Sequence, residues 1–219
     1  MITRLARLAS AIVSSKTSAI KKVLFIVSIL SKNARFHRII CIFAVYKPFK
    51  IDIMAIIREV LGHRPQWGKR CFFAENAALV GNVVMGDDVS IWYGAVLRAD
   101  VDGIRIGNRV NIQDVACVHQ SAGHPAVLGD EVSLGHGAIV HGAHICRGAL
   151  IGMNAVVLDD AVVGEGSIVA AGAVVLEGTA IGKGELWAGI PARKVKDILP
   201  EKAAEYAAHY MVAKTWYEG

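Results

Sequence analysis

The chain has 219 residues, of which 54% are apolar, and a formal net charge of +5. Residues 1–53 hold ten Lys/Arg against one acid, whereas residues 54–219 hold fourteen against eighteen. The main body is therefore mildly acidic, which gives a role in nucleic-acid binding little electrostatic support. The four cysteines form no CxxC pair, and this favours a reducing, cytoplasmic setting over a disulfide framework.

The first 53 residues differ in composition from the rest of the chain. Their apolar runs, VLFIVSIL (23–30) and IICIFAVY (39–46), are each shorter than the roughly 20 residues that span a bilayer. We interpret residues 1–53 as a basic extension that is disordered or precedes a true start at Met54. The basic, nearly acid-free composition leaves organellar import or association with a membrane surface as the alternative.

A repeat of six residues runs through the next segment, within residues 54–196. An aliphatic residue recurs, often followed by Gly, and a small or β-branched residue usually stands four positions later. This spacing fits neither a helix nor an alternating strand, but it fits a short strand with a turn, three of which close one coil of a parallel β-helix. Seventeen units predict nearly six coils, with these aliphatic positions inside: Val80, Met85, Ile91, Leu97, Ile106, Ile112, Val118, Leu128, Leu134, Val140, Ile145, Ile151, Val157, Val163, Val169, Val175 and Ile181.

Two insertions interrupt the repeat, and a helix is predicted after it. Nine residues separate Leu97 from Ile106, so ADVDG is expected to form a bulging corner. Ten residues separate Val118 from Leu128, so QSAGHPA is expected to form an external loop. Residues 197–219 are interpreted as a C-terminal helix along the solenoid, with this stripe on one face: Ala204, Ala208, Met211 and Thr215.

The repeat predicts which polar side chains lie one above another. Counting along the coils places Arg98, His119 and His141 in one column on one edge of the prism. His119 and His141 are thus neighbours in space although 22 positions separate them in the chain. Two imidazoles at this separation suit a single metal ion, with metal–nitrogen distances of about 2.0–2.1 Å.

A third histidine falls on a different edge. Asp114 and His136 stack one coil apart there, with Gln113 beside them. His136 therefore cannot meet His119 and His141 within one chain, but it can do so where two edges meet in a threefold assembly. The arrangement predicts a homotrimer with three metal sites, each shared across an interface.

The segments RADVDGIRIGNRVNIQDVACVH and LGHGAIVHG resemble the gamma-class carbonic anhydrase family, particularly its short bacterial members, over about residues 54–196. The resemblance implies an all-β solenoid, a left-handed parallel β-helix, assembled as trimers. It also implies zinc, or iron or cobalt, held by three histidines from two subunits. Carried onto this sequence, the ligands are His119, His136 and His141, and the polar residues around them are Arg98, Asp100, Gln113 and Asp114.

Three neutral imidazoles leave one coordination position open, as in a catalytic site. A metal-bound hydroxide there is expected to attack carbon dioxide and give bicarbonate, with Gln113 orienting the hydroxide or the substrate. We expect Arg98 and Asp114 to form an ion pair between subunits, and Asp100 to support Arg98 or to bind the neighbouring subunit.

The sequence also departs from the family pattern. Fully active members carry additional glutamates near the site, but Val101 follows Asp100 here and QSAGHPA contains no carboxylate. His124 is the candidate substitute for moving protons, and His209 and Tyr210 fall where the C-terminal helix can approach the site. Hydration activity is accordingly expected to be weak.

Two other functions are open at this point. A hexapeptide-repeat acyltransferase acting on a coenzyme A thioester shares the solenoid and often the ending GIPAR, and it needs one histidine as a general base rather than three as ligands. A non-catalytic trimeric assembly module is the other alternative. Metal content and carbon dioxide hydration distinguish the three.

Overall fold

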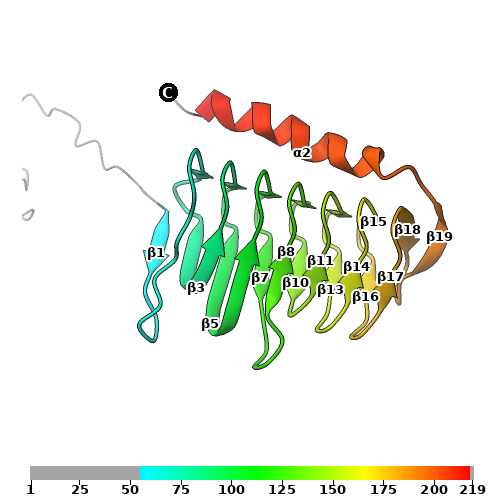
Figure 1. Cartoon of the computed structure of the whole chain (residues 1–219), viewed down its shortest axis with the longest axis horizontal. Coiled ribbons are helices and arrows are strands. Elements are labelled where there is room, and N and C mark those ends of the chain that lie inside the picture. Colours follow the sequence, from blue (N-terminus) through cyan, green and yellow to red (C-terminus); the bar gives the residue numbers. More distant parts are fainter. Residues whose placement is uncertain (1–54, 218–219) are drawn as a thin grey trace, which may run out of the picture. The chain divides into compact units, whose positions relative to one another are not determined.

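The computed structural model describes residues 55–217, which lie within one compact unit, residues 50–219. The predicted extension, residues 1–53, and the proposed start at Met54 lie outside the described residues. The described chain is a parallel β-solenoid with a C-terminal helix (Figure 1), as predicted. No helix within residues 55–217 is long and apolar enough to cross a membrane.

The solenoid has three faces, and its strands follow one another from coil to coil. Face one contains β1 (Ile56–Arg58), the first halves of β3 (Ala78–Met85) and β5 (Val96–Ile106), β7 (Cys117–His119), β10 (Ile139–His141), β13 (Val156–Val157) and β16 (Val174–Val175). Face two contains the second halves of β3 and β5, then β8 (Ala126–Leu128), β11 (His144–Ile145), β14 (Val162–Val163) and β17 (Ala180–Ile181). Because β3 and β5 continue around the corner, these two faces form one eleven-stranded sheet.

Face three is a separate eight-stranded sheet. It contains β2 (Phe72–Phe73), β4 (Ser90–Ile91), β6 (Asn111–Ile112), β9 (Ser133–Leu134), β12 (Leu150–Ile151), β15 (Ile168–Val169), β18 (Glu185–Ala188) and the terminal β19 (Arg193–Asp197). Only β19 is antiparallel to its neighbour. The remaining seven strands supply one per coil, so the solenoid has one coil more than predicted.

The additional coil comes from residues that precede the predicted start of the repeat. β1 pairs in parallel with β3, and β2 pairs with β4. The prediction that Val80 opens the inward column is also wrong by one residue, because Leu79 pairs with Leu97 and is fully buried, while Val80 is half-buried. With Leu79 in that place, the spacing to Met85 becomes six residues, the usual spacing of the repeat.

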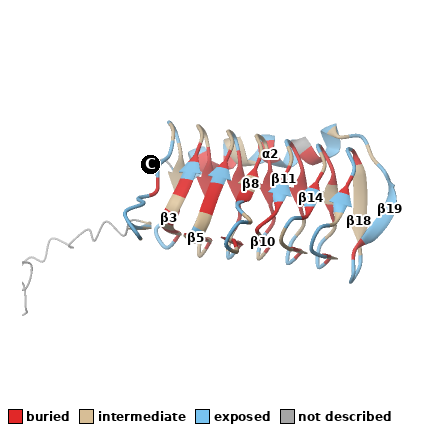
Figure 2. Ribbon diagram, turned by 60° about the horizontal axis from the view of Figure 1, so that its bottom comes forward, coloured by how far each residue is buried: buried red, intermediate tan, exposed pale blue. Residues whose placement is uncertain are grey.

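The interior is filled by columns of aliphatic side chains, which explains the high apolar content of the chain. Most inward residues on the other faces are fully buried. On face one, the inward residues from the second coil onward have no exposed surface: Leu79, Leu97, Val118, Val140, Val157 and Val175. Burial of each such side chain stabilises the fold by roughly 1.5–3 kcal/mol. In Figure 2, the buried segments recur from coil to coil along the strands.

Both predicted insertions are present, and they contact each other. The pairing of β3 with β5 shifts after Gly81, so residues 100–103 bulge at the corner between faces one and two. Residues 120–125 form an external loop closed by a bridge between Ser121 and His124. The Asp102 carboxylate accepts a hydrogen bond from the Gly123 backbone N–H at 3.0 Å, so the bulge anchors the loop.

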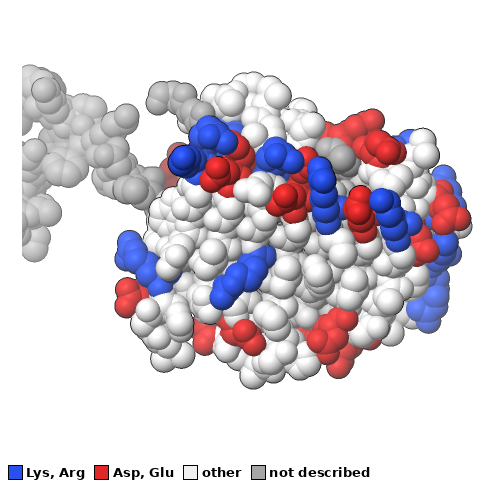
Figure 3. Space-filling model, in the orientation of Figure 1, with Lys and Arg blue, Asp and Glu red and all other residues white. Residues whose placement is uncertain are grey.

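A ladder of alternating charges follows the edge between faces two and three. Figure 3 shows the blue and red side chains succeeding one another along this edge. The ion pairs that build it join Arg70 to Asp88, Glu131 to both Arg109 and Arg147, and Glu165 to Lys183. Because most of these side chains are well exposed, each pair contributes little to stability, and the ladder mainly orders the turns.

The C-terminal helix α2 (Glu201–Ala213) continues into a 3₁₀ turn, η2 (Lys214–Tyr217), and contacts β9 and β12 of face three. The predicted helix is confirmed, but its predicted buried stripe is wrong. Ala208 and Thr215 are exposed, whereas Ala203, Ala207 and Lys214 are buried. The buried side is displaced by about one residue, and Lys214 on this side donates to the Arg70 carbonyl and to Asp88.

Candidate metal centre

His119 and His141 lie side by side at the ends of β7 and β10. The parallel register pairs them directly, which confirms the predicted column. His119 Nδ1 lies 3.0 Å from His141 Nε2, and the ring centroids are 5.1 Å apart. Arg98 belongs to the same column, because Leu97 pairs with Val118 in the preceding coil.

A carboxylate binds the outer nitrogen of each of these two histidines. Asp100 Oδ1 lies 3.2 Å from His119 Nε2, and Asp159 Oδ1 lies 2.5 Å from His141 Nδ1. Burial raises the pKa of each carboxyl group, but hydrogen bonds from Arg98 and His119 to Asp100, and from His141 and Ser121 to Asp159, leave both pKa values below the ordinary value. The carboxylates are therefore acceptors, and each histidine is the donor through its outer nitrogen.

This hydrogen bonding makes both inner nitrogens acceptors. A neutral imidazole has one N–H group, so a proton on the outer nitrogen leaves a lone pair on the inner one. Two lone pairs that face each other at 3.0 Å repel unless a cation or a shared proton lies between them. Two ligand nitrogens on one tetrahedral zinc ion are about 3.3 Å apart, so the pair fits a metal ion with a small adjustment.

His136 lies on the edge between faces three and one, as predicted. Ile112 pairs with Leu134, and this register stacks Asp114 on His136, whose Nδ1 lies 2.9 Å from Asp114 Oδ2. The His136 side chain is 48% exposed. Among the described residues, no three His, Cys, Asp or Glu side chains gather closely enough to hold a metal ion. One chain thus presents a histidine pair on one edge and a single histidine on another.

Gln113 is held in place by a short polar network in face three. Its side chain is almost fully buried, and its Nε2 donates to Asn111 Oδ1 at 3.0 Å. Asn111 Nδ2 in turn donates to Ser133 Oγ at 2.7 Å. Since Asn111 and Ser133 are also buried, the network fixes the orientation of the amide next to Asp114.

Asp159 is the functional candidate that sequence reasoning missed. It lies in the turn after β13, 18 positions beyond His141, whereas the coil here is 17 residues long, so Leu158 follows His141 in the column and Asp159 follows Gly142. The count that paired the histidines therefore does not point to Asp159; its side chain reaches back to the His141 ring from the neighbouring position. Within the chain, Arg98 binds Asp100, and Asp114 binds His136; the support of Arg98 by Asp100 was predicted, whereas an Arg98–Asp114 pair between subunits remains a prediction.

The other predicted polar residues lie around these two groups. His124 Nδ1 lies 2.7 Å from Asp160 Oδ1, and this hydrogen bond raises the pKa of His124. Tyr210 packs against the Trp92 ring, and burial, with the Asp114 charge, raises its pKa. His209 is exposed and packs against Tyr210 and Trp216.

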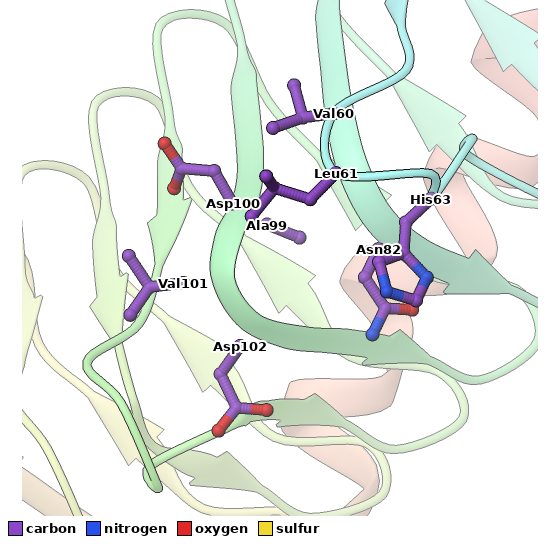
Figure 4. Close-up of a pocket in the computed structure, with 8 residues that line it drawn as sticks. All are labelled: Val60, Leu61, His63, Asn82, Ala99, Asp100, Val101 and Asp102. Atoms are coloured by element: carbon purple, nitrogen blue, oxygen red, sulfur yellow. The ribbon is translucent and has the colours of Figure 1, made fainter.

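A hollow of 120 Å³ opens beside Asp100 (Figure 4). Its lining comes from Val60, Leu61 and His63 of the first coil, from Asn82 and from residues 99–102 of the bulge. Val101 is 51% exposed and lines it. The hollow gives solvent a route to the carboxylate that binds His119.

Comparison with known proteins gives the family. The family model for the bacterial transferase hexapeptide (six repeats) matches residues 142–177. A "probable carbonic anhydrase" of Methanocaldococcus jannaschii is 54% identical over 134 residues, which are 61% of this chain and 84% of that protein. Gamma carbonic anhydrase 1, mitochondrial, of Arabidopsis thaliana is 40% identical over 154 residues, covering 68% of this chain and 56% of that protein.

A solved structure has the same fold. The hexapeptide transferase family protein from Anaplasma phagocytophilum aligns with a TM-score of 0.71 at 36% identity, over 74% of this chain and 98% of that one. The sequence identity to the two carbonic anhydrases shows that this chain belongs to the gamma-class carbonic anhydrase family.

Proposed function

We propose that this protein is a homotrimeric, metal-dependent carbonic anhydrase that interconverts carbon dioxide and bicarbonate at sites shared between subunits. The observation that carries the proposal is the facing pair of imidazole nitrogens of His119 and His141, 3.0 Å apart, each held by a carboxylate on its other nitrogen. A carboxylate on the outer nitrogen is typical of metal-ligating histidines. His136, with Asp114 on its Nδ1, has the same arrangement and is the proposed third ligand, from a neighbouring subunit.

Zinc, or iron or cobalt, bound by three neutral imidazoles supplies a nucleophile for carbon dioxide at neutral pH by lowering the pKa of a coordinated water. The chain itself supplies orientation and charge. Asp100 holds the His119 ring, and Arg98 fixes Asp100 through a 2.5 Å ion pair. The buried Gln113 amide, fixed by Asn111, orients the substrate or the nucleophile.

An outward-facing apolar column beside the histidine pair, half-buried except at the exposed Ile139, supports the proposed trimer. The outward residues of face one pair with one another from coil to coil and are all apolar: Ala78, Val96, Cys117, Ile139, Val156 and Val174. On the other edge, Val115 and Met153, next to Asp114 and His136, are 66% and 53% exposed. Continuous apolar surface of this kind is typical of protein interfaces, and here it borders both halves of the proposed site.

Mixing two inactive variants tests the shared site. His119→Ala and His136→Ala subunits, mixed in equal amounts and allowed to exchange, should regain zinc and hydration activity in about one quarter of the sites, because half of the subunits keep the histidine pair and half of their neighbours keep His136. His119→Ala mixed with His141→Ala is the matched control. It should regain nothing, since both substitutions damage the same half of every site. Equal recovery in both mixtures, or none in either after confirmed exchange, contradicts the proposal.

The structural similarity to a hexapeptide transferase family protein makes an acyltransferase the main alternative function. A metal-free sample that transfers acyl groups from coenzyme A thioesters would favour the acyltransferase over the anhydrase. A zinc-loaded trimer without hydration activity in stopped flow would favour an assembly module. We propose a cytoplasmic location. The alternative is import into an organelle, which would agree with the mitochondrial Arabidopsis relative.

A further inference from the structure

We propose that Asp159 is a positioning residue that fixes the His141 imidazole in the tautomer protonated on Nδ1. This inference rests on the proposed metal centre. Nothing in the repeat itself calls for a carboxylate at this turn, yet Asp159 Oδ1 lies 2.5 Å from His141 Nδ1. The side chains of Asp159 and His141 are only 21% and 31% exposed, so the contact is largely shielded from water.

The backbone leaves room for this contact. Gly142 follows His141, and a Cβ atom at this position would lie 2.3 Å from Asp159 Oδ1. A side chain at position 142 would therefore push the carboxylate away from the imidazole. The absence of a side chain next to His141 allows Asp159 to reach the ring from the next coil.

The chemical consequence concerns the other nitrogen of the ring. With the proton on Nδ1 bound to Asp159, the His141 Nε2 lone pair points toward His119 Nδ1. The carboxylate also makes the imidazole a stronger donor to a metal. Loss of such a partner typically weakens metal affinity 10–100-fold.

Asp160 is the natural control because it is the next residue and also binds a histidine. Its partner is His124, in the external loop, which is not part of the histidine pair. The two carboxylates share the turn and differ in the histidine that they hold. A general effect of lost charge would appear in both variants, whereas a positioning effect would appear only at Asp159.

The experiment compares Asp159→Ala, Asp159→Asn and Asp160→Ala in the full-length protein. Zinc affinity is measured by competition with a chromophoric chelator, and the His141 tautomer is read in the metal-free protein by nitrogen–proton correlation NMR. We expect Asp159→Ala to lose about 10–100-fold in zinc affinity and the Nδ1–H tautomer. Asp159→Asn, whose amide oxygen can still accept the proton, should keep the tautomer and lose less affinity. Asp160→Ala should match the wild type in both readouts.

The two proposals fail in different ways. Wild-type protein that binds no zinc would refute the metal centre, while the tautomer measurement would still decide the role of Asp159. Wild-type zinc affinity with an unchanged tautomer in Asp159→Ala would overturn the positioning role and leave the metal centre intact. If Asp159→Ala does not fold, the more conservative Asp159→Asn decides: affinity equal to that of the wild type would count against a role for the charge.

Discussion

Lys214 joins the C-terminal turn to the first coils, and its replacement tests what holds the helix on the solenoid. The side chain is 5% exposed, and its Nζ donates to the Arg70 backbone carbonyl at 2.7 Å and to Asp88 Oδ1 at 3.0 Å. These partners are 144 and 126 positions away in the chain. We predict that Lys214→Met, which keeps the length of the stem and removes the charge, destabilises the protein.

The structure sets the size of the effect. Removing one partner of a fully buried ion pair costs about 3–5 kcal/mol because the other charge is left uncompensated. Asp88 keeps a second partner, since Arg70 Nε donates to it at 2.9 Å, so the loss is smaller. The Arg70 carbonyl also loses its donor, which costs about 1 kcal/mol. We therefore expect the free energy of unfolding to fall by about 2 kcal/mol.

The effect should depend on pH with a definite sign. Hydrogen bonding to Arg70, and then to Lys214, lowers the pKa of Asp88 from 3.8 to about 2. A carboxyl group with a lowered pKa in the folded state stabilises the protein above pH 3.8, and this stabilisation is lost as the pH falls toward 2. The shift corresponds to at most about 2.4 kcal/mol, which solvent screening reduces to about half. The difference between variant and wild type should shrink over this range.

Urea unfolding at a fixed protein concentration measures the change, because the stability of the proposed trimer would depend on concentration. Lys183→Met is the matched control: it removes an ion pair with Glu165 whose side chains are 61% and 50% exposed. We expect that variant to stay within about 0.5 kcal/mol of the wild type. The reasoning is refuted if Lys214→Met loses no more than Lys183→Met, or if its loss is as large at pH 2 as at pH 7.

Two further predictions concern the bulge and the external loop. Gly81 has φ +76°, and a Cβ there would lie 2.1 Å from the Ala99 carbonyl oxygen, so Gly81→Ala should cost more than about 3 kcal/mol in urea unfolding. Gly123→Ala has a similar φ of +82° with open space around it and should cost only about 1 kcal/mol; equal losses would show that the clash is relieved. Asp160→Asn should lower the pKa of His124 in an NMR titration, because the carboxylate raises it in the wild type, and an unchanged pKa would contradict the contact.

The periodicity of the sequence predicted the histidine columns because a solenoid turns a count of residues into a position in space. The pairing of His119 with His141, and of Asp114 with His136, follows from the repeat even though one ten-residue step interrupts it. An insertion at a corner lengthens a loop without changing which face follows. The predicted stacking of the histidines was therefore insensitive to the inserted residues at the corners.

The first coil could not be found in this way. Between β1 and β2 the chain makes a long excursion, with a bridge from Val60 to His63 and another from Gln66 to Val84, and no six-residue spacing survives there. The parallel pairing of β1 with β3 and of β2 with β4 shows that this segment belongs to the solenoid. The phase error at Val80 has the same origin, because the repeat was read without the coil before it.

The partners of the histidines were harder to predict than the histidines themselves. A carboxylate can reach up or down a column, so the sequence did not determine whether Asp100 would bind only Arg98 or also His119, and in the structure it binds both. Asp159 stands in an ordinary turn of the repeat, where an acidic residue usually faces solvent. Side-chain hydrogen bonding, rather than backbone periodicity, decides these contacts.

The geometry of the coil explains why a site for three histidines would need more than one chain. Neighbouring coils are about 4.8 Å apart, so one edge can place two imidazoles close enough for one ion, and the register places His119 and His141 side by side in this way. A third imidazole on that edge would lie a further coil away, and the packed interior separates the other edges. Only a second chain can bring its own edge against the pair. Metal binding and association then become linked, because an ion that binds only the trimer stabilises it by mass action, and chelation and dilution should favour the same dissociation.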